Sequence, residues 1–182
     1  MTEEHLPNDA QLALLSLLAE KPMHAYEITQ LIEERGMREW TPIGFSSVYY
    51  ALKKMRSAGW LTQEEAESEI GGPQRNIFSL TPAGIKTWKK AIIKAISKPH
   101  PVENPFLIGI SAIPLLEVAE TERALIGFLD HLSAAEQRLK EKIQSYGSHA
   151  PPHVHAMFDY SLKQIGAAIT WVEQWRHKLC ES

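Results

Sequence analysis

One short segment combines hydroxyl, aromatic and basic side chains at helical spacing, a set that could contact nucleic acid. Val48, Leu52 and Met55 recur at i, i+4 and i+7, so they would share the buried face of one helix. This helix would begin near Ser46, which suits an N-cap, and end before Gly59. Its outward residues would be Ser46, Ser47, Tyr49, Tyr50, Lys53 and Lys54. A helix can enter the major groove of DNA, where such residues reach bases or phosphates.

The charges around this segment favour that interpretation over a plainly solvated helix. The formal net charge of the chain is −3, which by itself argues against a nucleic-acid partner. However, no Asp or Glu lies between Trp40 and Gln63, whereas a merely solvated helix usually mixes both signs. The distribution of charge therefore indicates a local basic surface on a mildly acidic protein.

Two further segments hold candidates for DNA contact. Gln74 and Arg75 follow the Gly-Gly-Pro tip at residues 71–73, where an arginine could reach the DNA backbone or minor groove. The alternative is a plain hairpin turn with a solvated arginine. A phosphate-cradling loop is disfavoured, since no Lys-Ser/Thr pair follows these glycines. His24 and Tyr26 open another predicted helix, whose N-terminus could meet a phosphate, although Tyr26 could equally be packed.

The remaining reactive side chains do not form a convincing site. His149, His153 and His155 could together bind a metal, but they lie in a predicted proline-containing loop, and we favour a solvated loop with no metal. Cys180 is the single cysteine, which excludes a disulfide framework within the chain. No His-Glu-x-x-His, Gly-x-Ser-x-Gly or dinucleotide-binding motif is present, so we expect neither an enzyme nor a cofactor.

Hydrophobic spacing and capping residues predict the elements that position the candidates in the first half of the chain. Helices are expected over residues 10–18 and 25–35, the second ending at Gly36. After the Ser46 helix, strands at 60–67 and 75–80 would form a β-hairpin. Thr81 and Pro82 then introduce a helix to about residue 97. This order of elements is that of a winged helix-turn-helix, which we assign to residues 1–98.

The second half, residues 99–182, is predicted to be a helical dimerisation region. Prolines at 99, 101, 105 and 114 indicate a joint between the two regions. Two long helices on either side of a loop at 147–152 would then pair in antiparallel orientation. Their apolar seams are formed by Leu125, Leu129, Leu132, Leu139, Ile143 and Tyr146, and by Phe158, Leu162, Ile165, Ile169, Val172 and Leu179.

Phe128, Trp171 and Trp175 lie beside these seams and need another partner, which a second subunit could supply. The chain is therefore expected to form a homodimer. The flat faces of these rings would also suit a small aromatic or apolar effector, although we favour a plain interface.

The composition and the N-terminal sequence bear on the cellular location of the protein. Apolar residues make up 44% and charged residues 23%, values of ordinary globular proteins rather than disordered ones. No stretch reaches the ~18 apolar residues of a membrane span. The polar, acidic N-terminus does not look like a secretory signal. We expect a cytoplasmic protein with no membrane partner.

Three segments resemble the PadR family of bacterial regulators. Residues 22–27 (PMHAYE) are similar to the family's P-L-H-G-Y-E, with Ala25 in place of the usual glycine. Residues 47–55 (SVYYALKKM) are similar to T-V-Y-P-A-L-x-R-L, with Tyr50 in place of proline. Residues 71–75 and 80–84 are similar to the wing sequences G-G-P-x-R and L-T-x-x-G, and Asn104-Pro105-Phe106 resembles the opening of the longer C-terminal region in the family.

The resemblance implies a mostly α fold with a small β-hairpin, in which a homodimer binds double-stranded DNA at a roughly palindromic operator. Most relatives repress transcription, and their effectors are diverse. Two alternatives stay open. An activator on the same scaffold could not be distinguished by sequence. A winged helix used only for protein interaction would be expected to carry an acidic or apolar outer face on its third helix.

Overall fold

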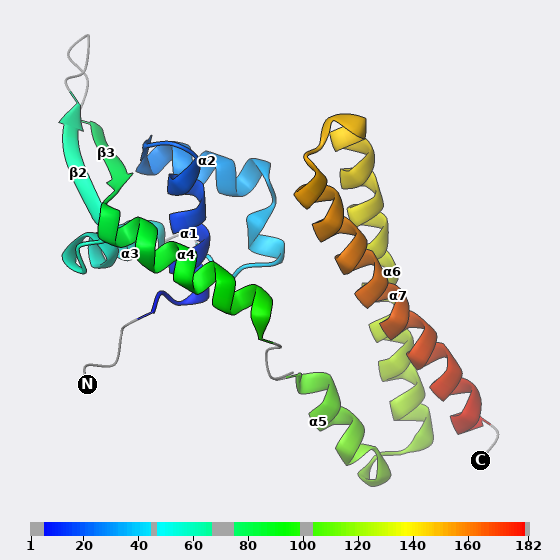
Figure 1. Cartoon of the computed structure of the whole chain (residues 1–182). Helices are drawn as coiled ribbons and strands as arrows, with labels where there is room; N and C mark the ends of the chain where they lie inside the picture. The colour runs from blue at the N-terminus through cyan, green and yellow to red at the C-terminus, as the bar shows by residue number, and fades with distance from the viewer. Residues whose placement is uncertain (1–5, 45–46, 67–74, 99–103, 181–182) are drawn as a thin grey trace. The chain divides into compact units, whose positions relative to one another are not determined.

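The computed structural model describes residues 6–44, 47–66, 75–98 and 104–180. The chain divides into two compact units, Met1–Pro101 and Val102–Ser182. Among the described residues, every strand belongs to the first unit, and the second is helical (Figure 1). The fold is therefore mostly α with a small antiparallel sheet, as the sequence predicts.

The first unit contains all the helices and both hairpin strands that the sequence predicts. Its elements are α1 (Asp9–Glu20), β1 (Met23–His24), α2 (Ala25–Glu34), a short 3-10 helix η1 (Met37–Glu39), α3 (Ser47–Ser57), β2 (Leu61–Ala66), β3 (Arg75–Leu80) and α4 (Pro82–Ser97). Asn8 caps α1 by accepting a hydrogen bond from the backbone N–H of Gln11 at 2.9 Å. Gly36, with φ of 56°, adopts the left-handed conformation that stops α2. Ser46, the expected N-cap of α3, lies outside the described residues.

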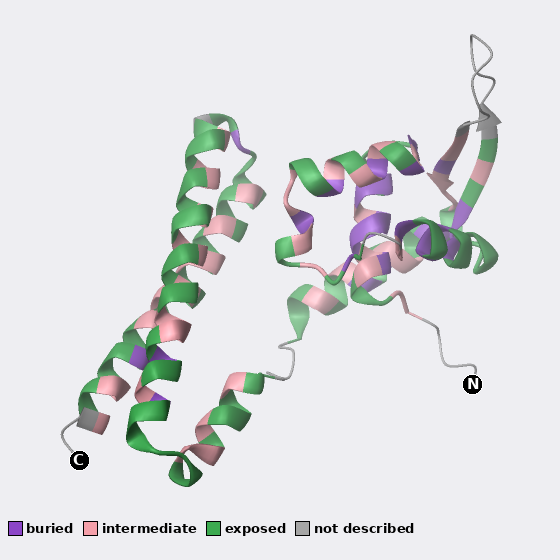
Figure 2. Ribbon diagram, turned by 180° about the vertical axis from the view of Figure 1, so that it is seen from behind, coloured by how far each residue is buried: buried purple, intermediate pink, exposed green. Residues whose placement is uncertain are grey.

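Apolar side chains from the first three helices, the strands and the segments between them form one core, whose buried residues are purple in Figure 2. The largest fully buried members are Leu14, Leu15, Leu17, Met23, Ile28, Ile32, Val48, Leu52 and Met55. Trp60 is also buried, and Trp88 packs against the core while its Nε1–H donates to Ser16 Oγ at 3.1 Å. These two tryptophans therefore hold the unit together, because both face its interior.

The sheet has a third strand that the sequence did not predict. The order is β1–β3–β2, with both pairs antiparallel. β1 places Met23 opposite Phe78 and His24 opposite Ile77. This short pairing joins the start of α2 to the middle of β3, so two segments far apart in sequence lie side by side.

The hairpin joins α4 at a close backbone contact around Gly84. The N–H of Thr81 donates to Trp60 O at 3.0 Å, and the Thr81 hydroxyl donates to Gly59 O at 2.7 Å. The same hydroxyl accepts from the Gly84 N–H at 2.9 Å, which caps α4. A β-carbon at Gly84 would stand 2.1 Å from Trp60 O, so the junction requires a glycine for space.

The second unit contains α5 (Pro105–Ala112), η2 (Ile113–Leu115), α6 (Val118–Tyr146), η3 (Gly147–His149) and α7 (Pro152–Cys180). α6 and α7 run side by side, as predicted (Figure 1). The proline-containing joint also includes a helix that was not predicted, α5, because Asn104 caps it and Pro105 occupies its first position. One expectation was wrong: His153 and His155 lie in the first turn of α7 rather than in a loop, because Pro152 can begin a helix.

The predicted seams are only partly covered within one chain. Leu125 and Val172 are buried, whereas the other seam residues are half-buried. Several apolar side chains at the start of this unit are largely exposed, namely Leu107, Ile108, Leu115, Leu116 and Val118. The unit thus keeps apolar surface that the pairing of α6 with α7 does not cover. None of the described helices has the length and apolar character needed to cross a membrane.

Candidate nucleic-acid interface

α3 separates a buried apolar face from an exposed polar one, as its spacing predicts. Val48, Leu52 and Met55 are at most 1% exposed. On the other side, Tyr49 and Tyr50 expose 64% and 71% of their surface, and Lys53 and Lys54 are also exposed. Ser47 is half-buried, and its hydroxyl donates to Gly44 O at 2.7 Å, so it steadies the start of the helix.

The exposed face of α3 carries positive charge only. No acidic residue occurs in α3, and its last turn contains Lys54 and Arg56. The Arg56 guanidinium donates to the side-chain oxygen of Gln63 in β2, which fixes its position beside the hairpin. Lys53 and Lys54 therefore stand as point charges next to two tyrosines, with no carboxylate on the helix to neutralise them.

His24 and Tyr26 lie at the start of α2, beside β3. His24 Nδ1 lies 3.2 Å from Asn76 O, and since a carbonyl oxygen only accepts, this ring nitrogen is the protonated one. Tyr26 is 68% exposed rather than packed, and its hydroxyl accepts from Gln30 Nε2 at 3.3 Å. Both residues are thus held in place with ring surface left for a partner.

Glu27 keeps a negative charge at this helix start. The His24 backbone N–H donates to Glu27 Oε2 at 2.9 Å, and this bond lowers the pKa of the Glu27 carboxyl below its ordinary value of 4.5. The ammonium of Lys21, 3.5 Å from Glu27 Oε1, acts in the same direction. The carboxylate is therefore used to cap α2 and to pair with Lys21.

A surface depression of about 420 Å³ connects these groups. It is lined by His24, Ala25, Tyr26, Glu27, Tyr49, Asn76 and Phe78. The start of α2, the first turn of α3 and strand β3 thus meet around one concave surface. Asn76 and Phe78 were not predicted as site residues, although their alternation along a strand could have placed them on one face.

The candidates for DNA contact near the hairpin tip, Gln74 and Arg75, are only partly described. Arg75 begins β3 opposite Ala66, but its side chain lies outside the described part of the structure. Gln74 lies outside it altogether, as does Ser46. These three residues remain predictions from sequence.

In the second unit, the three aromatic candidates meet a fourth ring that sequence reasoning missed. Phe106 of α5 stacks on Phe128 with ring centroids 4.2 Å apart and meets Trp171 edge-on at 5.9 Å. Trp171 also stacks on Trp175 at 5.7 Å. Part of the partner expected from another subunit is therefore supplied by this chain's own α5. The N-cap residue Asn104 is the sequence signal that could have predicted α5 and with it the place of Phe106. In the structure, Asn104 Oδ1 accepts from the Phe106 N–H at 3.0 Å.

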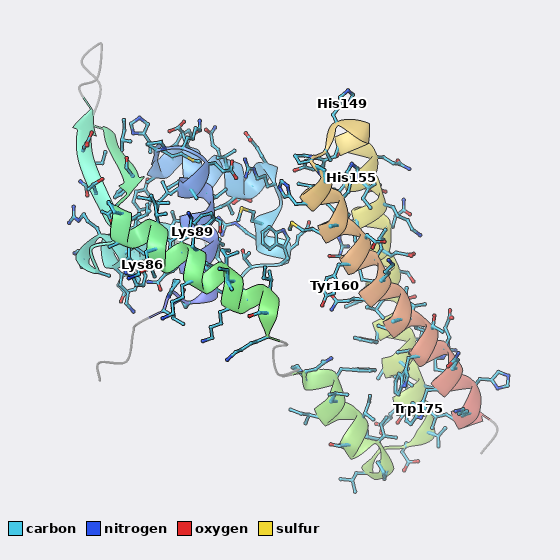
Figure 3. The ribbon with its side chains drawn as sticks, in the orientation of Figure 1. Lys86, Lys89, His149, His155, Tyr160 and Trp175 are labelled. Carbon is cyan, nitrogen blue, oxygen red and sulfur yellow. The ribbon has the colours of Figure 1, made fainter. Side chains whose placement is uncertain are left out.

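The histidines near the turn between α6 and α7 do not converge. His149 ends η3, and His153 and His155 follow in α7 (Figure 3). Among the described residues, no group of three or more His, Cys, Asp or Glu side chains is placed to hold a metal ion.

Residues 14–90 match the family described as transcriptional regulator PadR-like. Crystal structures of Bacillus subtilis PadR are similar to the chain over nearly its whole length. The complex with operator DNA has 20% identity and a TM-score of 0.76, covering 93% of this chain and 98% of that one. The complex with p-coumaric acid has 19% identity and a TM-score of 0.77, covering 94% and 99%. A PadR-like regulator from Bacillus cereus has 14% identity and a TM-score of 0.69, covering 97% and 99%. No curated protein matched the chain.

Proposed function

We propose that this chain, a DNA-binding transcriptional regulator whose residues 14–90 belong to the PadR-like family, represses transcription as a homodimer on a palindromic operator. Regulators of this family are DNA-binding transcription factors rather than enzymes, and no catalytic role is proposed. The observation that carries the proposal is the exposed, acid-free face of α3 with Tyr49, Tyr50, Lys53 and Lys54.

In the proposed complex, α3 enters the major groove with this face toward the bases. Lys53 and Lys54 lie near the end of α3 and would neutralise phosphates or read bases. Tyr49 lines the depression that also contains His24 and Tyr26, so the start of α2 would touch the backbone that borders the same groove. Ser46, Ser47, Gln74 and Arg75 are assigned to the interface from sequence, with Arg75 on the wing.

The homodimer is supported by apolar surface that a single chain leaves uncovered. Most seam residues of α6 and α7 are half-buried, and Ile108 and Leu115 of the α5 region are 73% and 87% exposed. A second copy covering this surface would remove it from water, the usual driving force of association. Two recognition helices could then occupy successive major grooves about 34 Å apart.

Removing the second unit should therefore separate the subunits. A chain that ends at Lys98 keeps the core of the first unit and loses α5, α6 and α7. We expect it to sediment as a monomer and to bind the full operator at least about 10²-fold more weakly, because linked half-sites gain affinity through effective concentration. Sedimentation and DNA titration measure both effects. A truncated chain that remains a tight dimer would place the main contact in the first unit.

Selection of bound duplexes from a random DNA pool tests the function itself. The expected result is a palindromic consensus with half-site centres about 10 base pairs apart or a multiple of this. Its genomic sites should overlap promoters, where a bound dimer blocks transcription. Failure to enrich any sequence would contradict sequence-specific binding, and sites lying only upstream of promoters would indicate an activator instead.

An effector would bind at the aromatic residues Phe128, Trp171 and Trp175. Because these side chains are flat and apolar, the effector would be an apolar or aromatic compound. Trp171 is 41% exposed, so one of the rings already presents surface to a ligand. p-Coumaric acid, found bound to the Bacillus subtilis PadR, is the natural first compound to test. To release DNA, the compound must bind more tightly to the dimer arrangement that does not bind DNA than to the arrangement that does.

The effector hypothesis predicts that some member of a panel of flat aromatic compounds, starting with p-coumaric acid, quenches tryptophan fluorescence and weakens operator binding at the same concentrations. A Trp171→Phe, Trp175→Phe variant should lose the quenching and keep operator binding in the absence of compound. Quenching without any change in operator affinity would show a pocket with no regulatory role. Absence of quenching across the panel would leave Trp171 and Trp175 as interface residues only.

A further inference from the structure

Positive charge is concentrated in α4, and the proposed operator contacts do not involve the basic residues of this helix. The chain has a net charge of −3, yet no Asp or Glu occurs between Glu69 and Glu103. The basic residues in that interval are Arg75, Lys86, Lys89, Lys90, Lys94 and Lys98. All of these except Arg75 belong to α4 or to its C-cap.

These lysines lie on the side of α4 that faces away from the core. Gly84 and Ala91 are buried, and Trp88 packs against the core, which defines the inner side of the helix. Lys86, Lys89, Lys90, Lys94 and Lys98 are all exposed, and the first two are seen on the first half of α4 in Figure 3. We call these five residues the lysine face. Lys86, Lys90 and Lys94 follow one another at i, i+4 spacing, so they are neighbours on the helix surface, and Lys98 follows at the C-cap.

Such a face differs from the other solvated helices of this protein. In α6 the Lys140 ammonium lies 2.9 Å from Glu136, and in α7 the Lys163 ammonium lies 2.7 Å from Asp159, both at i, i+4 spacing. α4 contains no carboxylate, so its like charges repel one another and destabilise the helix. A solvated surface alone does not require this arrangement, whereas a polyanionic partner would offset the repulsion.

We propose that the lysine face binds the phosphates of duplex DNA that flanks the operator, independently of base sequence. This inference rests on the proposed DNA-binding function and extends it to a second surface. The lysines span about 18 Å of helix, and duplex DNA carries one negative charge per ~1.7 Å of its axis, so several phosphates can be neutralised together. The face has no tyrosine, asparagine or arginine to read base edges, and lysines act on phosphate as point charges.

The test compares duplexes of two lengths that carry the consensus from the DNA selection. The short duplex has about 25 base pairs. The long duplex adds random-sequence flanks to a total of about 60 base pairs, so the flanks amount to several helical turns of ~10 base pairs each. The variant is Lys86→Gln, Lys89→Gln, Lys94→Gln. Lys140→Gln, Lys142→Gln, Lys163→Gln in the second unit is the control with the same change in net charge.

For the wild-type protein, we expect tighter binding and a steeper salt dependence on the long duplex. The α4 variant should lose this gain, with the salt slope falling by about 0.9 for each lost phosphate contact, and should bind the short duplex as the wild type does. Unchanged binding of the short duplex also shows that the variant is folded. The control should behave as the wild type on both lengths.

Several results would overturn the inference while leaving the proposed function intact. The wild type could bind both lengths equally, the α4 variant could keep the full gain on the long duplex, or the control could lose as much as the α4 variant. Equal losses by the α4 variant on both lengths would move the lysine face into the operator contact itself and also reject the flanking site. A wild-type protein that binds neither duplex would contradict the proposed function as well.

Discussion

Replacing Lys53 and Lys54 with alanine should weaken operator binding by about 10²–10³-fold at moderate salt, because each dimer would lose four phosphate or base contacts. If all four contacts are to phosphates, the slope of log K against log salt should fall by about 3.6. Both side chains are exposed on α3, so the fold should not change. Fluorescence anisotropy over a range of salt concentrations measures both quantities.

The matched control for this variant is Lys140→Ala, Lys142→Ala in α6, which changes the net charge equally. It should bind the operator within about twofold of the wild type, because neither lysine belongs to the proposed DNA-contact surface. Wild-type affinity and salt slope in the α3 variant would remove α3 as the recognition helix. A loss confined to one operator position, with the salt slope unchanged, would assign these lysines to base reading.

Replacing Gly84 with alanine should destabilise the first unit by about 3 kcal/mol, at the upper end of the range for overpacking. The added β-carbon would stand 2.1 Å from Trp60 O and 3.0 Å from Trp60 C, and backbone atoms cannot rotate away as a side chain can. α4 would have to move off the hairpin and weaken the Thr81 bonds to Gly59 and Trp60. The expected fall in the midpoint of thermal unfolding is about 10–20 °C, measured by circular dichroism.

Gly127→Ala in α6 is the control for this substitution, since a β-carbon there would meet nothing within 4 Å. Alanine favours a helix over glycine by about 0.5–1 kcal/mol, so the control should be neutral or slightly stabilising. If Gly84→Ala melted like the wild type, the close approach of α4 to Trp60 would not be needed for stability.

The sequence by itself determined most of the long elements and the two faces of α3. Helical spacing of Val48, Leu52 and Met55 placed Tyr49, Tyr50, Lys53 and Lys54 outside the core, because a helix of 3.6 residues per turn fixes which residues share a face. Capping residues located helix ends for the same local reason, as Thr81 did for α4. These signals depend on residues a few positions apart, so one sequence is enough to read them.

Only the tertiary structure decided which of these elements meet. The pairing of β1 with β3 brought His24 and Tyr26 to Asn76 and to Tyr49 of α3, and backbone hydrogen bonds of this kind leave little trace in side-chain type. Phe106 likewise joined the aromatic residues of α6 and α7 through packing between segments distant in sequence. The need for glycine at position 84 arose from a backbone approach to Trp60, a distance that no local pattern encodes.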